Sequence, residues 1–276
     1  MSHVIAIANQ KGGVGKTTTA VNLGASLAAA EQRTLVIDMD PQGNASSGLG
    51  VVPSPTRASL YGVLLDLAPL GSAIVRSVHL PFLDVVPTTL DLVGAEVELA
   101  DQAERELRLR RALDGTRDMY DFVLIDCPPS MGLLTLNTLA AADSVLIPLQ
   151  PEFFALEGLS QFAETIDLVR QYLNPSLGVE GVLLTMYDGR LKLAQHIADE
   201  ATKFFGDRTF RTVIPRNVRL AEAPGFGKPV LAYDILSPGA KSYLALATEL
   251  ITRAPMLQVD RHGADEAHTL PEVRVP

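Results

Sequence analysis

Short apolar runs alternate along this chain with longer segments of helical period, and this alternation limits the folds open to it. The runs are rich in β-branched residues and are apolar at successive positions, as Val4-Ile5-Ala6-Ile7-Ala8 and Phe122-Val123-Leu124-Ile125 show. Successive apolar positions are typical of parallel strands that helices cover on both faces. The pattern therefore predicts an α/β fold with a doubly wound, mostly parallel sheet and helices on both faces.

The expected elements follow from the two periods. Strands are expected at residues 3–8, 34–38, 83–87, 121–126, 144–149, 180–186 and 212–214. Helices are expected at residues 16–30, 91–113, 133–141, 155–173, 192–205 and 238–252. Residues 42–60 are rich in Gly, Ser and Pro, so we expect a long loop there that is functional or mobile.

Length and composition agree with one such domain, because 276 residues with 47% hydrophobic side chains can bury a large core. We expect a single domain over residues 1–253. Residues 254–276 mix Pro, Asp, Glu and His without helical period, which predicts a disordered tail or, as the alternative, a motif that binds a partner. The lone Cys127 cannot form an internal disulfide or a four-thiolate metal site, and we expect a buried structural cysteine.

The sequence favours a cytoplasmic protein. It has no uncharged apolar run of about 18 residues, the length that a membrane-spanning helix needs. Its first residues do not resemble a secretory leader, with a basic region, an apolar stretch and a cleavage site.

The charge of the chain is unevenly distributed. The net charge is −9, which argues against nucleic acid as a partner if it is spread evenly. Residues 1–189 hold 11 Lys and Arg against 22 Asp and Glu, whereas residues 190–253 hold 10 against 6. The later stretch is consistent with a local anion-binding surface or with an ordinary solvated face.

A glycine-rich loop follows the first expected strand and opens the first expected helix: Asn9-Gln10-Lys11-Gly12-Gly13-Val14-Gly15-Lys16-Thr17-Thr18-Thr19. In this context, glycines let backbone N–H groups converge on phosphate oxygens. Lys16 is then placed to reach the β- and γ-phosphates, and the Thr17 hydroxyl to ligate Mg²⁺. The loop predicts binding of a magnesium nucleoside triphosphate.

The loop is a variant of the usual pattern, because Gln10 stands where the first glycine is expected and Lys11 follows it. A second lysine is useful if it reaches a phosphate that Lys16 does not, including one held by a facing subunit. The alternative for Lys11 is a solvated surface lysine.

Carboxylates follow two of the expected strands. Asp126 ends the run 122–125, where a Walker-B aspartate would hold Mg²⁺ directly or through water. Asp38 and Asp40 follow the run 35–37, and their alternation points them to opposite faces if the strand continues. Asp40, which lies beside the loop, is the stronger candidate for orienting the attacking water; the alternative is an Asp-Pro turn.

Four motifs together resemble the ParA/Soj chromosome-partitioning ATPases over about residues 3–252. They are Lys11-Gly12-Gly13-Val14-Gly15-Lys16-Thr17-Thr18, Asp38-Met39-Asp40-Pro41-Gln42-Gly43-Asn44, Asp126-Cys127-Pro128-Pro129 and Ile214-Pro215-Arg216-Asn217-Val218-Arg219-Leu220-Ala221-Glu222-Ala223-Pro224. The first motif is shared by the wider deviant-Walker-A group of P-loop NTPases, including MinD and the nitrogenase iron protein, and the last narrows the match to ParA/Soj.

The resemblance implies that the chain binds Mg-ATP and closes into a face-to-face homodimer with two nucleotides between the subunits. It implies that this dimer binds double-stranded DNA without sequence preference and associates with the nucleoid. A DNA-bound ParB-type partner is then expected to accelerate a slow hydrolysis of ATP.

The resemblance also assigns roles to individual residues. Lys11 matches the lysine that crosses to the partner's nucleotide, and Gly12 matches a position where two subunits approach closely. Asp40 matches a residue needed for hydrolysis. The remaining assignments are the phosphate loop (Gly13, Val14, Gly15, Lys16, Thr18), the magnesium site (Thr17, Asp126), the adenine pocket (Met186, Pro215, Asn217) and the DNA contacts (Arg190, Arg219).

Three other functions share this fold. A MinD-like membrane-cycling ATPase requires a basic amphipathic C-terminal helix, whereas residues 257–266 are acidic and contain Gly. A metabolic ATP-dependent ligase would show turnover stimulated by its substrate and no DNA binding. The iron-protein function requires two cysteines per subunit, and the chain has one.

Overall fold

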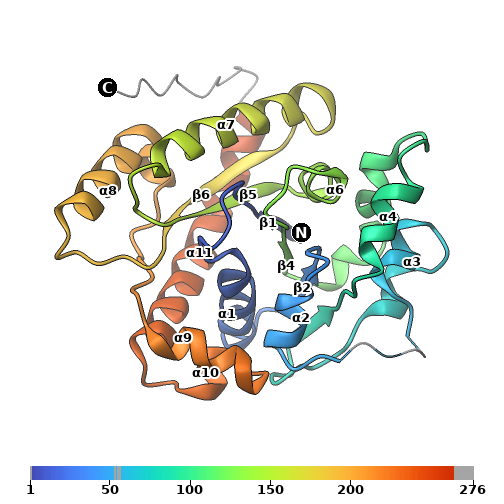
Figure 1. Ribbon diagram of the computed structural model, residues 1–276, viewed down its shortest axis with the longest axis horizontal. Helices are drawn as coiled ribbons and strands as arrows, with labels where there is room; N and C mark the ends of the chain where they lie inside the picture. Colours follow the sequence, from blue (N-terminus) through green and yellow to red (C-terminus); the bar gives the residue numbers. More distant parts are fainter. Residues whose placement is uncertain (1, 53, 55–56, 264–276) are drawn as a thin grey trace.

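A computed structural model describes residues 2–52, 54 and 57–263, in which six strands form one sheet with helices on both sides (Figure 1). The strands are β1 (His3–Ile7), β2 (Thr34–Asp38), β3 (Leu83–Val86), β4 (Phe122–Asp126), β5 (Ser144–Leu149) and β6 (Gly178–Leu184). Their order is β3-β2-β4-β1-β5-β6, and every neighbouring pair is parallel. The predicted doubly wound α/β fold is confirmed.

Two helical layers cover the sheet. One layer contains α1 (Lys16–Ala29), α2 (Asn44–Gly48), α9 (Val218–Glu222), α10 (Val230–Tyr233) and α11 (Pro238–Gly263). The other contains α3 (Leu60–Leu64), α4 (Leu92–Glu98), α5 (Arg108–Leu113), α6 (Leu133–Ala141), α7 (Ala155–Tyr172) and α8 (Lys192–Phe205). Short 3₁₀ turns complete the connections: η1 (Leu70–Ala73), η2 (Arg105–Leu107), η3 (Arg117–Met119), η4 (Gly206–Arg208) and η5 (Ala223–Phe226).

Each face of the sheet has its own hydrophobic core. Val4 and Ala6 of β1 belong to the core beneath α3–α8, whereas Ile5 and Ile7 belong to the core beneath α1 and α11. Successive side chains of a strand point to opposite faces, so both sets of residues must be apolar. This is the physical reason for the uninterrupted apolar runs in the sequence.

Helix α1 lies very close to the sheet because Gly24 has no side chain. A Cβ on Gly24 would lie 2.6 Å from Cγ2 of Val36 in β2. The close approach fixes the position of α1, and with it the loop that precedes the helix at the carboxyl ends of the strands.

Several expected boundaries are wrong. The helix expected at 91–113 is interrupted: Glu104 adopts a left-handed conformation (φ 54°), and α5 begins only at Arg108. Asn137 of α6 donates to the Arg105 carbonyl and accepts from the Leu109 amide, which holds the second piece in its own position. Tertiary hydrogen bonds thus override a continuous helical period.

The strand expected at 212–214 is also absent from the described structure. Ile214 donates one backbone hydrogen bond to Leu184, and only isolated bridges at Thr209 and Pro215 accompany it. Proline has no N–H with which to continue the ladder. The predicted loop at 42–60 contains the short helix α2. Gly43, which adopts the left-handed conformation (φ 65°), directly precedes this helix.

The last helix differs from its expected end as well. α11 continues to Gly263, past the boundary expected at residue 253, so residues 254–263 are helical rather than part of a tail. The sequence analysis ended the helix at residue 252 because the residues that follow lack a helical period. Pro255 does not stop the helix, since one proline removes a single hydrogen bond and its cost of about 3 kcal/mol can be offset by the rest of a long helix. The remainder of the predicted tail, residues 264–276, lies outside the described residues.

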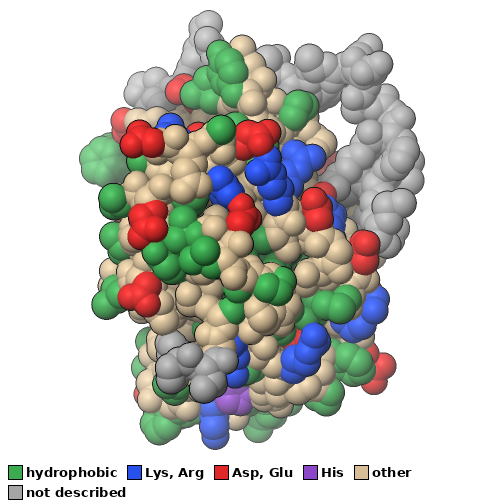
Figure 2. All heavy atoms as spheres, turned by 90° about the vertical axis from the view of Figure 1, so that its right-hand side faces the viewer, with side chains coloured by type: hydrophobic (Ala, Val, Ile, Leu, Met, Phe, Trp, Pro, Cys, Tyr) green, Lys and Arg blue, Asp and Glu red, His purple; other side chains and the backbone are tan. Residues whose placement is uncertain are grey.

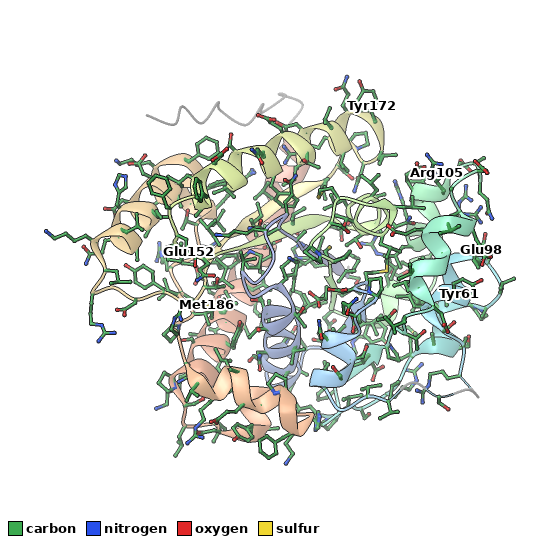
Figure 3. The ribbon with its side chains drawn as sticks, in the orientation of Figure 1. Tyr61, Glu98, Arg105, Glu152, Tyr172 and Met186 are labelled. Carbon is green, nitrogen blue, oxygen red and sulfur yellow. The ribbon has the colours of Figure 1, made fainter. Side chains whose placement is uncertain are left out.

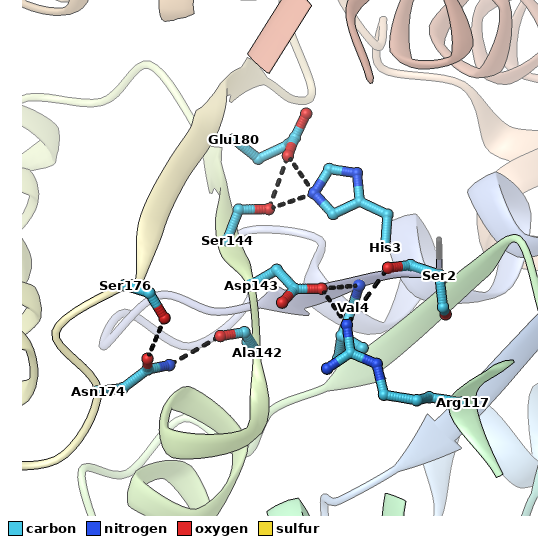
Figure 4. Close-up of polar contacts among 10 residues, drawn as sticks. All are labelled: Ser2, His3, Val4, Arg117, Ala142, Asp143, Ser144, Asn174, Ser176 and Glu180. Carbon is cyan, nitrogen blue, oxygen red and sulfur yellow. Dashed lines mark hydrogen bonds and ion pairs between the residues drawn. The ribbon is translucent and has the colours of Figure 1, made fainter. Parts of the chain in front are cut away.

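At the amino ends of the strands, polar side chains join β1, β5 and β6 (Figure 4). Ser144 Oγ donates to Glu180 Oε2 at 2.6 Å, and His3 Nε2 lies 3.0 Å from each of these two atoms. Asp143 accepts from the Val4 amide and from Arg117 Nη2, both at 2.8 Å. These contacts hold the strand ends together at the edge of the sheet opposite to the glycine-rich loop.

Candidate functional site

The glycine-rich loop connects the carboxyl end of β1 to the amino end of α1, as the sequence predicts. Gly13 (φ 74°) and Gly15 (φ 89°) both adopt the left-handed conformation, which a residue with a side chain rarely adopts. Thr185 Oγ1 donates to the Val14 carbonyl at 2.7 Å and fixes the loop from the end of β6. Thr18 lies in the first turn of α1, where the backbone N–H groups have no partner within the helix. These N–H groups are therefore available to an anion bound at the loop.

Lys16 is a buried cation at the centre of this loop. Its residue is 6% exposed, and Nζ donates to the Lys11 carbonyl at 3.1 Å. Burial lowers the pKa of Lys16, and the negative charge of Asp126 opposes that fall most strongly. A buried amine surrounded by backbone amides is suited to an anion, because a phosphate oxygen supplies the partner that water supplies at the surface.

Asp126 ends β4 beneath the loop, and both of its carboxylate oxygens are buried without a hydrogen-bond partner in the described part of the chain. Burial raises the pKa of Asp126 well above its ordinary value, and the charge of Asp38 raises it further, while the Thr17 hydroxyl acts in the opposite direction. Buried polar atoms without partners are rare in proteins and point to a bound group. A divalent cation between Thr17 and Asp126 fits these residues.

The protein side chains alone do not complete a metal site. Within the described ranges, no group of three or more His, Cys, Asp or Glu side chains is placed to hold a metal ion. Mg²⁺ commonly takes one or two protein ligands and completes its shell with phosphate oxygens and water. Magnesium binding at Thr17 and Asp126 therefore fits the arrangement only together with a nucleotide.

Asp38 and Asp40 have different surroundings. Asp38 Oδ2 accepts from both the amide and the hydroxyl of Ser46, at 2.7 and 2.6 Å. Burial raises the pKa of Asp38 to about 6 in spite of these hydrogen bonds. Among the described residues, the Asp40 side chain accepts a hydrogen bond only from the Gln42 amide, at 3.0 Å, and its charge acts on Lys16. Asp38 thus anchors α2, whereas Asp40 is the carboxylate left beside the loop.

Lys11 makes a contact that the sequence analysis did not predict. Its Nζ lies 2.6 Å from Oε2 of Glu152, with 37% of the lysine side chain exposed and 49% of the glutamate (Figure 3). Glu152 follows β5, whose first half pairs with β1, so that the carboxyl end of β5 extends past the end of β1 where the glycine-rich loop begins. Its position after a strand is a signal that could have identified it. Next to Lys11, nothing lies within 4 Å of a Cβ placed on Gly12, so the fold of this chain alone does not require a glycine there.

A cavity of about 370 Å³ lies beside the loop. Met186, Pro215 and Asn217, the three residues expected to form an adenine pocket, all line it, and Gly15 and Thr18 of the loop line it too. Met186 is labelled in Figure 3. Asn217 Oδ1 is buried without a hydrogen-bond partner within the described residues. The structure therefore brings the expected pocket residues and the phosphate loop to one cavity, with an unused acceptor at its wall.

Arg190 and Arg219 lie outside this cavity on segments that contribute to it. Arg190 follows Met186 by four positions, and Arg219 follows Asn217 by two. Both are exposed, and both form ion pairs with carboxylates of the chain, Arg190 with Asp188 and Arg219 with Glu222 and Asp234. Cys127 is buried, and burial raises the pKa of its thiol to about 12, so the predicted structural cysteine is confirmed.

Comparison with known proteins agrees with this geometry. A family model described as an AAA domain matches residues 2–179. The chain is 57% identical over 253 residues to the chromosome partitioning protein ParA of Myxococcus xanthus (strain DK1622), which covers 92% of this chain and 89% of that protein. It belongs to the ParA/Soj family of chromosome-partitioning ATPases. The resemblance drawn from the four motifs is thereby confirmed.

Two further proteins extend the comparison. The present chain is 53% identical over 250 residues to the sporulation initiation inhibitor protein Soj of Bacillus subtilis (strain 168). The match covers 91% of the present chain and 98% of the B. subtilis protein. A crystal structure of cobyrinic acid a,c-diamide synthase from Mycobacterium smegmatis with bound ADP and magnesium matches over 100% of both chains, with 35% identity and a TM-score of 0.79. No helix in the described part of the ParA/Soj chain is both long and apolar enough to cross a membrane.

Proposed function

We propose that this protein is a nucleotide-switched DNA-partitioning ATPase, in which ATP and Mg²⁺ join two copies of the chain and only the pair holds DNA. The observation that carries the proposal is the phosphate loop itself: its Gly15 and Thr18 line the cavity, and the charge of the unpartnered Asp126 acts on its buried Lys16. Family membership supports the chemistry, and the M. smegmatis synthase, which has a related fold, was crystallised with bound ADP and magnesium.

Each residue of the site has a role in this proposal. Backbone N–H groups of residues 13–18 and Lys16 Nζ bind the phosphates, and Asn217 Oδ1 accepts from an amino group of the base. Thr17 and Asp126 hold Mg²⁺, which neutralises charge on the β- and γ-phosphates. Asp40 lies free of a structural partner other than Gln42, and it orients the attacking water.

In this proposal, Lys11 links the two subunits. Lys11 is held by Glu152 at the surface, where it can exchange that carboxylate for a phosphate of a facing subunit. Gly12 has open space around it, which allows the backbone of a second chain to approach. The proposed dimer therefore buries the loop of each chain against the other, with a nucleotide between them.

DNA binding requires a local basic surface, because the chain as a whole carries a net charge of −9. The face over α3 and α4 does not provide one: Figure 2 shows basic and acidic side chains intermingled there, and Arg105, Arg108 and Arg111 pair with Glu106, Asp66 and Glu104. The proposed surface carries Arg190 and Arg219 instead. Two phosphate contacts per protomer, about four per dimer, predict a log–log salt slope no steeper than about −3.6 from these arginines alone.

The proposal extends to partner and location. A ParB-type centromere-binding protein is proposed to accelerate hydrolysis and so release the DNA, which places the protein in the cytoplasm on the nucleoid. The curated names of the ParA and Soj relatives support this part of the proposal.

A retardation experiment tests the proposal directly. Double-stranded DNA is titrated with protein in ADP, ATP and a non-hydrolysable ATP analogue, all with Mg²⁺. Retardation is expected with ATP and the analogue but not with ADP. Lys16→Ala, which removes the buried cation of the loop, is expected to bind neither nucleotide nor DNA. DNA retarded equally in all three nucleotides would contradict the switch.

The alternative function is a metabolic ATP-dependent ligase, which the name of the M. smegmatis structure favours. The same experiment separates the two functions. A ligase is expected to leave DNA unretarded in every nucleotide and to hydrolyse ATP only when its substrate is added.

A further inference from the structure

The two arginines assigned to DNA are both occupied by carboxylates of their own chain. Arg190 donates from Nε and Nη2 to the two oxygens of Asp188, at 2.8 and 2.6 Å, and its backbone amide also donates to Asp188 at 3.1 Å. Arg219 Nη1 lies 2.7 Å from Glu222 Oε2, and its Nε lies 3.2 Å from Asp234 Oδ2. A carboxylate engages the guanidinium fork as a phosphate does, so each arginine already holds a group that resembles a DNA phosphate.

Asp188 also faces a second cation. The Tyr187 amide donates to the Ile214 carbonyl at 3.0 Å, which ties the segment of Asp188 to the segment of Arg216. The positive charge of Arg216 contributes to the low pKa of Asp188, after the larger effect of the hydrogen bonds from Arg190. Arg216 is exposed and forms no ion pair within the described ranges. One carboxylate therefore lies between two arginines at the outer side of the nucleotide cavity.

We infer that Asp188 is an internal competitor for DNA phosphates, which holds Arg190 and opposes the field of Arg216 until a phosphate displaces it. This inference rests on the proposed DNA binding. Arg190 is 89% exposed, so its pair with Asp188 is solvated and weak, and a phosphate can replace it without unfolding the loop. Asp188 thus lowers the affinity of each protomer for DNA without abolishing it.

The competitor has a consequence for the switch. If each protomer binds DNA weakly, retention depends on two protomers that act together, because the affinities of linked sites multiply. A stronger protomer would hold DNA without a partner chain. Asp188 therefore helps to keep a single protomer from retaining DNA, and it also lowers the affinity of the pair.

The test compares Asp188→Asn with Asp207→Asn. Asp207 is an exposed carboxylate of the net-positive stretch 190–253, which also contains Arg190. It forms no ion pair among the described residues, and its replacement makes the same change in charge as Asp188→Asn. DNA affinity is measured by anisotropy at several salt concentrations, with Mg²⁺ and a non-hydrolysable ATP analogue. Nucleotide affinity and thermal unfolding are recorded for each variant, so that a folding defect is visible.

An exposed ion pair of this kind changes an equilibrium constant by a factor of about 1.4 to 5. The loss of the pair in both protomers is therefore expected to lower the dissociation constant for DNA about 2- to 30-fold. The salt slope of Asp188→Asn is expected to steepen by up to about 1.8, because two arginines no longer exchange a carboxylate for a phosphate. Asp207→Asn is expected to change both quantities much less. Adding Arg190→Ala to Asp188→Asn is expected to remove most of the gain.

The outcomes separate this inference from the function on which it rests. If the parent protein binds DNA with the analogue but Asp188→Asn binds DNA no more tightly than Asp207→Asn, then Asp188 does not compete with DNA phosphates. The proposed function would still stand. A gain that persists in full after Arg190→Ala also refutes this competition. If the parent protein does not bind DNA in any nucleotide, the proposed function fails and the inference fails with it.

Discussion

Asp38, Asp40 and Asp126 lie at the carboxyl ends of β2 and β4, and their different hydrogen bonds suit them to different roles. Asp38 is satisfied by Ser46 and holds α2 against the sheet. Asp126 is buried with both oxygens unpartnered in the described part of the chain, as a residue near a cation should be. Asp40 retains a free side beside Lys16. The sequence predicts Asp40 and Asp126 as functional residues, and their surroundings agree with those proposed roles.

Asp40→Ala is expected to retain nucleotide binding and lose turnover. The substitution removes one hydrogen bond to the Gln42 amide, so the loop should keep its fold. Loss of a residue that orients water is expected to slow hydrolysis about 10²- to 10⁴-fold, as for other general-base residues. Single-turnover phosphate release measures the rate, and Asp101→Ala, which replaces an exposed carboxylate, is the control. Turnover at the parental rate in Asp40→Ala would remove Asp40 from the mechanism.

The residues of the phosphate loop could be predicted because their spacing alone implies backbone geometry, with glycines at 13 and 15 where the backbone is left-handed. The contact between Lys11 and Glu152 could not be predicted, since 141 positions separate the two residues and only the pairing of β1 with β5 brings them together. Glu222 lies only three positions from Arg219, so this ion pair could have been predicted from helical spacing. Asp188, likewise, is two positions from Arg190 and was overlooked.

At the scale of elements, the sequence predicts well the strands that are buried on both faces, because an apolar run without period has few other uses in a soluble domain. It fails where tertiary contacts decide. The helical period of residues 91–113 continues through Glu104, yet the backbone reverses there and Asn137 holds the second piece. Residues 212–214 have strand composition, but Pro215 has no N–H to continue a ladder, and the segment forms isolated bridges instead.

Arg33 and Asp121 illustrate how a polar pair joins two elements. Asp121 Oδ2 accepts from the Arg33 amide and from Nε, at 2.9 and 3.1 Å, and Oδ1 accepts from Nη2 at 2.7 Å. The backbone amides of Asp121 and Phe122 in turn donate to the Arg33 carbonyl. The pair therefore fixes where β2 and β4 begin beside one another.

Asp121→Asn is expected to lower the free energy of unfolding at pH 7 by about 0.5–1 kcal/mol, a value limited by the exposure of both side chains. The hydrogen bonds from Arg33 lower the pKa of Asp121 in the folded protein. Stability from this carboxylate is thus present above the ordinary pKa of aspartate and lost as the pH falls through the lowered value. Urea unfolding at pH 7 and pH 3 measures the difference between parent and variant, which should shrink at pH 3. A difference independent of pH, or equal to that of the control Asp101→Asn, would contradict the role of the charge.

At the scale of the whole molecule, net charge and function conflict unless charge is localised. A chain of net charge −9 repels a polyanion at long range, and its two candidate DNA arginines are already paired with carboxylates. One protomer alone is therefore a poor DNA-binding surface. In the proposed function, two protomers joined by nucleotide double the number of contacts, and the state of assembly, rather than the fold of the monomer, is then the controlling variable.

The molecular mass in solution under Mg-ATP tests this account most directly. Light scattering is measured on Asp40→Ala, in which turnover is blocked, with ADP and with ATP. Gly12→Val is the control, because its side chain has room in the protomer but would obstruct a facing chain. The account predicts twice the 29.6 kDa protomer mass for Asp40→Ala in ATP, and a monomer in ADP and for Gly12→Val in ATP. A monomer in every nucleotide at saturating Mg-ATP would contradict it.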